Sequence, residues 1–213
     1  LLRFTRRSSS PKGRLHLGEL AARTLPLLQS TLPANVDLSL EAPRDSVSWV
    51  DANDAELQQV IMNLFVNARD AVGNRENAVI RIRVRESRAP TGEPGVELVI
   101  EDNGHGMTQE VRDHIFDPFF TTKARGQGTG LGIPVVHKIL TEHAGTIQFD
   151  SAPGQGTRAR VWLPAVDAPM MPVQASAAED SAQPPCGHPS LVLLAEDHPL
   201  VNEVLQNSLR TDG

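Results

Sequence analysis

Residues 101–107, Glu-Asp-Asn-Gly-His-Gly-Met, combine acidic side chains with two glycines and could hold a polar ligand. The apolar run at 96–100 is typical of a buried strand, so Asp102 should be fixed near the end of that strand. Gly104 and Gly106 let the backbone approach a ligand closely. A carboxylate acceptor beside bare backbone suits a planar ligand that carries an amino group, such as adenine. Ordinary turns also use Asp-x-Gly-x-Gly, so this motif alone leaves both interpretations open.

Three side-chain amides form a second group of residues that could bind a ligand. Gln59, Asn63 and Asn67 are spaced one helical turn apart within 51–72, the longest helical pattern in the chain, and should share one face. A buried amide without a partner costs about 1–3 kcal/mol, so each amide needs either loop backbone or a ligand. The carbonyl oxygen of Asn67 would suit Mg²⁺, which prefers oxygen ligands and commonly bridges substrate phosphates. Both interpretations remain open on this evidence.

A glycine-rich run at 126–132, Gly-Gln-Gly-Thr-Gly-Leu-Gly, directly precedes a helical pattern at 133–144. Glycines let the backbone wrap an anion, and the positive end of the following helix would face it. A mobile linker is the weaker interpretation, because a helix follows at once. The run is not a Walker A loop, since no Gly-Lys-Ser/Thr follows it. A Rossmann fingerprint is also a poor match, because no strand precedes the run.

Three polar residues near these motifs have more than one interpretation. Lys123 and Arg125 precede the glycine-rich run, and could close over a phosphate or simply be solvated loop charges. The hairpin signal at 154–157 could bring the Thr157 hydroxyl near Asp102, either directly or through a water molecule, if their strands are neighbours. An ordinary hairpin explains Thr157 equally well.

The elements that must position these residues follow from periodicity. Helical patterns cover 17–28, 51–72, 109–115 and 130–144, and Pro26 should kink or shorten the first of them. Strand patterns cover 36–40, 47–50, 78–85, 96–100, 146–149 and 157–163. In 78–85 isoleucine and valine alternate with arginine, which predicts a half-buried strand with a solvated arginine row.

Composition sets broad limits. The 213 residues predict one main domain with extra pieces, and the net charge of −6 gives no reason to expect nucleic-acid binding. Cys186 is the only cysteine, which excludes an intrachain disulfide and fits a reducing, cytoplasmic compartment. No apolar run approaches the roughly twenty residues that span a bilayer, and no signal peptide is visible. The chain starts without Met and stops just after a helical pattern, so we expect both ends to be cut from a longer protein.

Together the motifs resemble the catalytic and ATP-binding domain of sensor histidine kinases, in the superfamily shared with gyrase, Hsp90 and MutL. The similar segments occur in order over roughly 15–164: the N box at 63–71, the first glycine box at 102–107, the F box at 116–123, the second glycine box at 128–132 and the last glycine box at 154–157.

The resemblance implies an α/β fold, a two-layer sandwich of a mixed β-sheet and α-helices, which holds ATP between the layers. In it Asp102 accepts from the adenine amino group, Gly106 lies against the base, Asn67 binds Mg²⁺ and Asn63 lies near the phosphates. The other nucleotide-binding candidates are Gly104, Met107, Arg69, Lys123, Arg125, Gly128, Thr129, Gly130, Leu131, Gly132 and Thr157.

Two departures from the family pattern bear on the mechanism. Many members carry Lys or Arg three residues after the magnesium-binding Asn, where this chain has Asp70; Arg69, Lys123 and Arg125 are therefore candidates for the phosphate-binding cation. In the ATP-hydrolysing relatives a Glu one turn before that Asn acts as the base. Here this position is Asn63, a neutral amide that cannot take a proton from water, which favours phosphoryl transfer over hydrolysis.

The resemblance also implies a domain plan. We expect the end of a dimerisation and phosphoacceptor helix at 1–13, the catalytic domain at 14–165, a Pro/Ala/Ser linker at 166–189, and the truncated first strand and helix of a receiver domain at 190–213. The parent would then be a hybrid kinase.

Three hypotheses follow. The first is a histidine kinase domain that uses ATP and Mg²⁺ to phosphorylate a histidine on the upstream dimerisation domain, which lies before this chain, with a receiver domain or response regulator as the later partner. The second is a nucleotide-binding regulatory module without phosphoryl transfer. The third, a gyrase-type hydrolase, is disfavoured by Asn63 and by the receiver-like tail.

Overall fold

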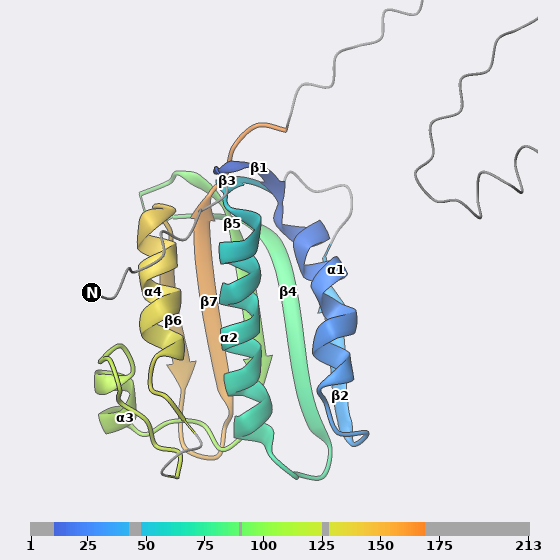
Figure 1. The fold of residues 1–213 in the computed structure, drawn as a ribbon, viewed down its shortest axis with the longest axis vertical. Coiled ribbons are helices and arrows are strands. Elements are labelled where there is room, and N and C mark those ends of the chain that lie inside the picture. The colour runs from blue at the N-terminus through green and yellow to red at the C-terminus, as the bar shows by residue number, and fades with distance from the viewer. Residues whose placement is uncertain (1–10, 43–47, 90, 125–127, 169–213) are drawn as a thin grey trace, which may run out of the picture. The chain divides into compact units, whose positions relative to one another are not determined.

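A five-stranded sheet organises the described part of the chain (Figure 1). The computed structural model describes residues 11–42, 48–89, 91–124 and 128–168. The sheet is mixed, because its first two strands pair in parallel and all later neighbours are antiparallel. Its strands, in spatial order, are β2 (Val36–Glu41), β4 (Ala78–Arg88), β5 (Pro94–Asp102), β7 (Thr157–Pro164) and β6 (Thr146–Ser151).

Helices cover one face of this sheet and complete a two-layer α/β fold, as predicted (Figure 1). They are α1 (Leu17–Ser30), α2 (Asp54–Val72) and α4 (Gly132–Glu142), with the short helix α3 (Gln109–His114) beside them. Ile61 and Phe65 of α2 are fully buried and belong to one core cluster with Ile80 and Ile82 of β4. Helix α2 therefore lies over the centre of the sheet, where it can position both the amide stripe and the glycine loops.

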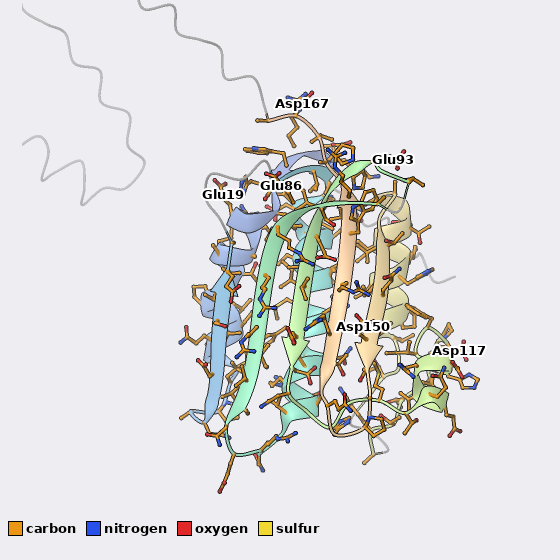
Figure 2. The ribbon with its side chains drawn as sticks, turned by 180° about the vertical axis from the view of Figure 1, so that it is seen from behind. Glu19, Glu86, Glu93, Asp117, Asp150 and Asp167 are labelled. Carbon is orange, nitrogen blue, oxygen red and sulfur yellow. The ribbon has the colours of Figure 1, made fainter. Side chains whose placement is uncertain are left out.

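The opposite face of the sheet carries the predicted arginine row, and Figure 2 views the molecule from this side. Arg83 lies between two carboxylates, with its Nε 3.0 Å from Glu41 Oε2 and its Nη1 3.0 Å from Glu101 Oε2. Arg158 reaches the other oxygen of Glu101 at 2.9 Å. The outer face is thus a ladder of cross-strand ion pairs, a recognised way of stabilising an exposed sheet surface.

Several elements differ from the sequence-based expectations. Strand β1 (Gly13–His16) was not predicted, and it pairs antiparallel with β3 (Trp49–Ala52), which lies two residues later than expected. Helix α1 continues through Pro26 and is not shortened there. Helix α4 begins at Gly132, later than the pattern from 130 suggested.

Parts of the predicted domain plan lie outside the described residues. These are positions 1–10 of the expected upstream helix, the linker from 169 onward and the whole receiver-like segment. Arg125 is also outside them. Within the described ranges, no helix is both long and apolar enough to cross a membrane.

Strand β3 joins the two ends of the described domain. Leu15 of β1 pairs with Val50, and Val50 also bridges to Ala165 just after β7. The N–H of Val166 then donates to the carbonyl of Trp49 at 2.9 Å. The start and the end of the domain therefore meet on the same short strand, which leads directly into α2.

A buried histidine locks α4 to the start of α2. His143 is 4% exposed, its Nδ1 donates to the carbonyl of Ile139 at 2.8 Å, and its Nε2 accepts from the N–H of Asn53 at 3.1 Å. Asn53 is itself the N-cap of α2, since its side chain accepts from the N–H of Glu56. The imidazole thus satisfies backbone groups at two helix ends at once.

Replacing His143 with alanine should lower the free energy of unfolding by about 1–3 kcal/mol, because the buried N–H of Asn53 loses the imidazole as its acceptor. Urea unfolding of parent and variant would measure the loss. Lys138→Ala is the matched control on the same helix, since Lys138 is 75% exposed and its 3.8 Å pair with Glu142 should contribute little. Equal losses in the two variants would contradict the bridging role of His143.

Candidate ATP-binding site

The carboxylate of Asp102 is buried at the end of β5. It is 7% exposed, and its Oδ1 accepts from the N–H of Gly104 at 2.8 Å. Burial raises the pKa of this carboxyl, while the N–H groups of Gly104 and Thr157 pull the pKa in the opposite direction and only partly offset the burial. A buried acceptor of this kind can select a ligand with an amino group, because a ligand without one would leave the buried carboxylate without a hydrogen bond, at a cost in free energy.

The loop after Asp102 is clamped between α2 and the β6–β7 hairpin. The N–H of His105 donates to the carbonyl of Ala71 near the end of α2 at 3.1 Å. On the other side, the N–H of Met107 donates to the hydroxyl of Ser151 at 2.9 Å. Gly106 has φ +66°, and a Cβ there would lie 2.0 Å from the carbonyl oxygen of Ala152. The first glycine box therefore needs glycine for close backbone packing, and its shape is fixed from both sides.

Thr157 lies opposite Asp102, because the two are register partners on neighbouring strands. A role for Thr157 near Asp102 required that their two strands be neighbours, and they are. Its hydroxyl lies 3.0 Å from that of Ser151, which in turn donates to the carbonyl of Gly156 at 2.8 Å. Ser151 was not identified from the sequence, since a serine at a strand end carries no signal of which loop it will contact.

The amide stripe of α2 is half-buried and runs away from this loop. Asn63 donates through Nδ2 to the carbonyl of Gly132 at 3.3 Å, which ties α2 to the start of α4. The side chain of Asn67 forms no hydrogen bond with any other residue in the described ranges. Its carbonyl oxygen therefore remains available as a neutral oxygen ligand, the type of donor that Mg²⁺ accepts.

The second glycine box, residues 128–132, leads directly into α4. Gly130 has φ +64°, and a Cβ there would lie 2.3 Å from the backbone of Phe119. Thr129 accepts weakly from the N–H of Leu131, at 3.4 Å, and Leu131 provides no side-chain cap for α4. The first N–H groups of α4 can therefore interact with an anion, as expected for a phosphate-binding helix start.

The candidate cations gather around a single carboxylate. Lys123 Nζ lies 2.5 Å from Asp70 Oδ2, and Arg69 Nη2 lies 2.8 Å from Asp70 Oδ1. Arg125 lies outside the described residues, so its role as a phosphate-binding cation stays a prediction.

A continuous series of contacts connects the predicted site residues. Asp102 leads through Gly104 to Ala71, because a Cβ at Gly104 would lie 2.5 Å from the Ala71 carbonyl. Asn67 lies one turn before Ala71 on α2, and Asn63, one turn earlier still, reaches Gly132. The adenine candidate and the phosphate candidates therefore both border α2, between its middle and its C-terminal end.

Comparison with known proteins gives matches over this region. The sequence profile of the family described as "Histidine kinase-, DNA gyrase B-, and HSP90-like ATPase" matches residues 52–167, more than half of the chain. Sensor histidine kinase ZraS of Escherichia coli (strain K12) is 42% identical over 120 residues, which cover 56% of this chain and 24% of ZraS. The chain thus spans about a quarter of the length of this curated relative.

Solved structures give the same picture. The catalytic domain of histidine kinase ThkA, in a nucleotide-free form, aligns with a TM-score of 0.62 at 29% identity, covering 73% of this chain and 97% of that domain. ThkA in complex with the response regulator protein TrrA aligns with a TM-score of 0.59 at 26% identity, covering 73% of this chain and 42% of the ThkA chain.

Proposed function

Because the chain belongs to the family of histidine kinase-, DNA gyrase B- and HSP90-like ATPases, we propose that it transfers the γ-phosphoryl group of ATP to a histidine of an upstream dimerisation domain. The chain contains the ATP-binding catalytic domain found in sensor histidine kinases. In this proposal the reaction is catalysed by positioning and electrostatics, as in other phosphoryl transfers.

Each group of residues has a role in this proposal. The Asp102 carboxylate accepts from the adenine amino group, and the tightly packed backbone at Gly106 and Met107 lies against the base. The carbonyl oxygen of Asn67 would hold Mg²⁺, since Mg²⁺ prefers oxygen ligands and no described residue forms a hydrogen bond with this side chain. When bound, Mg²⁺ neutralises charge on the phosphates.

The phosphates would lie against the second glycine box. Their binding groups are the backbone N–H groups of Gly128, Thr129, Gly130, Leu131 and Gly132, with Lys123, Arg69 and Arg125 as cations.

The observation that carries the proposal of transfer is the position of Asn63. Its side-chain nitrogen donates to the carbonyl of Gly132, where the phosphate loop ends and α4 begins, so we place this residue beside the γ-phosphate. An amide in that place cannot accept a proton from water. The attacking nucleophile must therefore come from elsewhere, which a histidine on a second domain would provide.

The decisive experiment combines this chain, ATP and Mg²⁺ with the proposed upstream dimerisation domain of the parent protein, which we expect to be a helical hairpin and which is produced separately. We expect phosphate to appear on the hairpin in an acid-labile, alkali-stable form, which is the signature of phosphohistidine. A hairpin with its acceptor histidine replaced by alanine is the control.

Each other outcome identifies a different function. ATP binding without phosphohistidine would favour the alternative, a nucleotide-binding regulatory module that acts on a partner. Steady release of inorganic phosphate without the hairpin would indicate a hydrolase of the gyrase type.

The partners and cellular location of the parent protein extend this proposal. We propose a receiver domain or response regulator as the next phosphate acceptor, in a two-component phosphorelay in the cytoplasm. Support comes from the ThkA relative, which was crystallised with the response regulator protein TrrA. The receiver-like segment at 190–213 is consistent with this partner but lies outside the described residues.

A further inference from the structure

Asp70 binds two cations from different parts of the chain. Arg69 donates to Asp70 Oδ1 through both Nε, at 3.0 Å, and Nη2, at 2.8 Å. Lys123, which lies 53 residues further along, donates to Oδ2 at 2.5 Å. The three side chains are similarly exposed, at 33% for Arg69, 30% for Asp70 and 32% for Lys123. The carboxylate thus links α2 to the segment that leads into the second glycine box.

This cluster lies directly beside the phosphate-binding candidates. A Cβ added to Gly128 would lie 3.2 Å from Cβ and Cδ of Lys123, so the lysine stem packs against the first described glycine of that loop. Asp70 itself follows Asn67 by one helical turn. The cluster therefore borders both the proposed Mg²⁺ ligand and the proposed phosphate loop.

The cluster retains donors and positive charge after its internal pairing. The ammonium of Lys123 has three N–H groups and uses one on Asp70, while Nη1 of Arg69 is not used in its bonds to Asp70. Two cations around one carboxylate leave a net charge of about +1 by formal counting.

We propose that Asp70 is a positioning carboxylate, which holds Arg69 and Lys123 in place so that their free N–H groups bind the phosphates of ATP. This inference rests on the proposed function. Its physical basis is preorganisation, since a cation already fixed in the free protein loses less conformational entropy when it binds. The pKa of Asp70 supports the pairing, because the hydrogen bonds and charges of Lys123 and Arg69 outweigh the burial that raises the pKa and lower it overall.

The test compares ATP and adenosine binding by calorimetry in the parent chain and in Asp70→Asn, which keeps the shape of the side chain but removes its charge. We expect ATP affinity to fall about tenfold, the scale for releasing two long side chains, while adenosine affinity stays the same. Glu41→Gln is the matched control, because it removes one carboxylate from an arginine pair on the outer sheet face. That variant should leave both affinities unchanged.

A double-mutant cycle with Lys123→Met isolates the ion pair between Lys123 and Asp70 of α2. The effect of Asp70→Asn should be smaller in the Lys123→Met background, because only Arg69 is then left to be positioned. Tighter ATP binding by Asp70→Asn would overturn the proposal and show that the carboxylate competes with phosphate. Unchanged ATP affinity, or an equal loss for adenosine, would also overturn it.

The outcome separates this inference from the proposed function. If the parent chain binds ATP with magnesium but Asp70→Asn behaves like the parent, only the positioning role fails. If the parent chain binds no ATP, the proposed function fails and the positioning role fails with it.

Discussion

Asp102→Ala should abolish measurable ATP binding while the domain remains folded. The variant removes a carboxylate that is 7% exposed and that we propose as the acceptor for the adenine amino group. A site built to hydrogen-bond one ligand group discriminates strongly, by about 10⁴-fold when a partner is missing, because the buried groups left behind are unpaired. Calorimetric titration with ATP would measure the loss, and circular dichroism would confirm that the fold is retained.

The fold should survive because an ionised Asp102 does not stabilise it. Burial raises the pKa of this carboxyl, so the folded state holds its proton more tightly than the unfolded state does. The stability that protonation contributes is present at low pH and is lost as pH rises through the raised pKa. At neutral pH the charge is therefore a cost, and its removal offsets part of the hydrogen bond lost by Gly104.

ATP binding should show the opposite pH dependence. Only the ionised carboxylate is a pure acceptor, so ATP affinity should fall as pH decreases through the raised pKa of Asp102, at a higher pH than for an ordinary aspartate.

Asp150→Ala is the control for the Asp102→Ala variant, since Asp150 pairs with Arg160 at 3.0 Å on the outer face of the sheet. Equal ATP affinity in Asp102→Ala and in the parent would refute the adenine assignment.

Asn67→Ala should remove the magnesium dependence of ATP binding. The amide is half-buried on α2 and lacks a hydrogen-bond partner among the described residues, which leaves its carbonyl oxygen free for the ion. One neutral protein oxygen can suffice, because Mg²⁺ usually retains several waters and takes other ligands from the phosphates. ATP titrations with Mg²⁺ and with a chelator would give the dependence for each variant.

Gln59→Ala provides the comparison for this variant, because it removes an amide from the same stripe two turns earlier. Its magnesium dependence should match that of the parent. A magnesium effect that persists in Asn67→Ala would mean that the ion is held by another residue.

The main layers of the fold were predictable because their signals are local. Helix α2 was expected over 51–72 and occurs at Asp54–Val72, with Asn53 as its N-cap. Both signals for this helix, the capping residue and the long helical repeat of apolar residues, lie within the segment itself. Strand β4 followed from strict alternation, and Ile80, Ile82 and Val84 are all buried. The mixed sheet and its helical cover, which the family resemblance implied, are also confirmed.

The remaining features depend on partners distant in sequence. Strand β1, with the sequence Gly-Arg-Leu-His, has a single apolar side chain and so shows no alternation, and it forms by pairing with β3. His143 has no neighbouring motif, and only the packing of α4 beside α2 brings it to the N–H of Asn53. The ion pair between Asp70 and Lys123 also spans 53 residues, so the sequence left the phosphate-binding cation open.

The junction at β3 has a mechanical consequence. Both β1 and the segment after β7 are anchored to this four-residue strand, and one residue separates it from α2. A force applied through either end of the domain would therefore act on the N-terminal end of α2, the helix that carries Asn63 and Asn67.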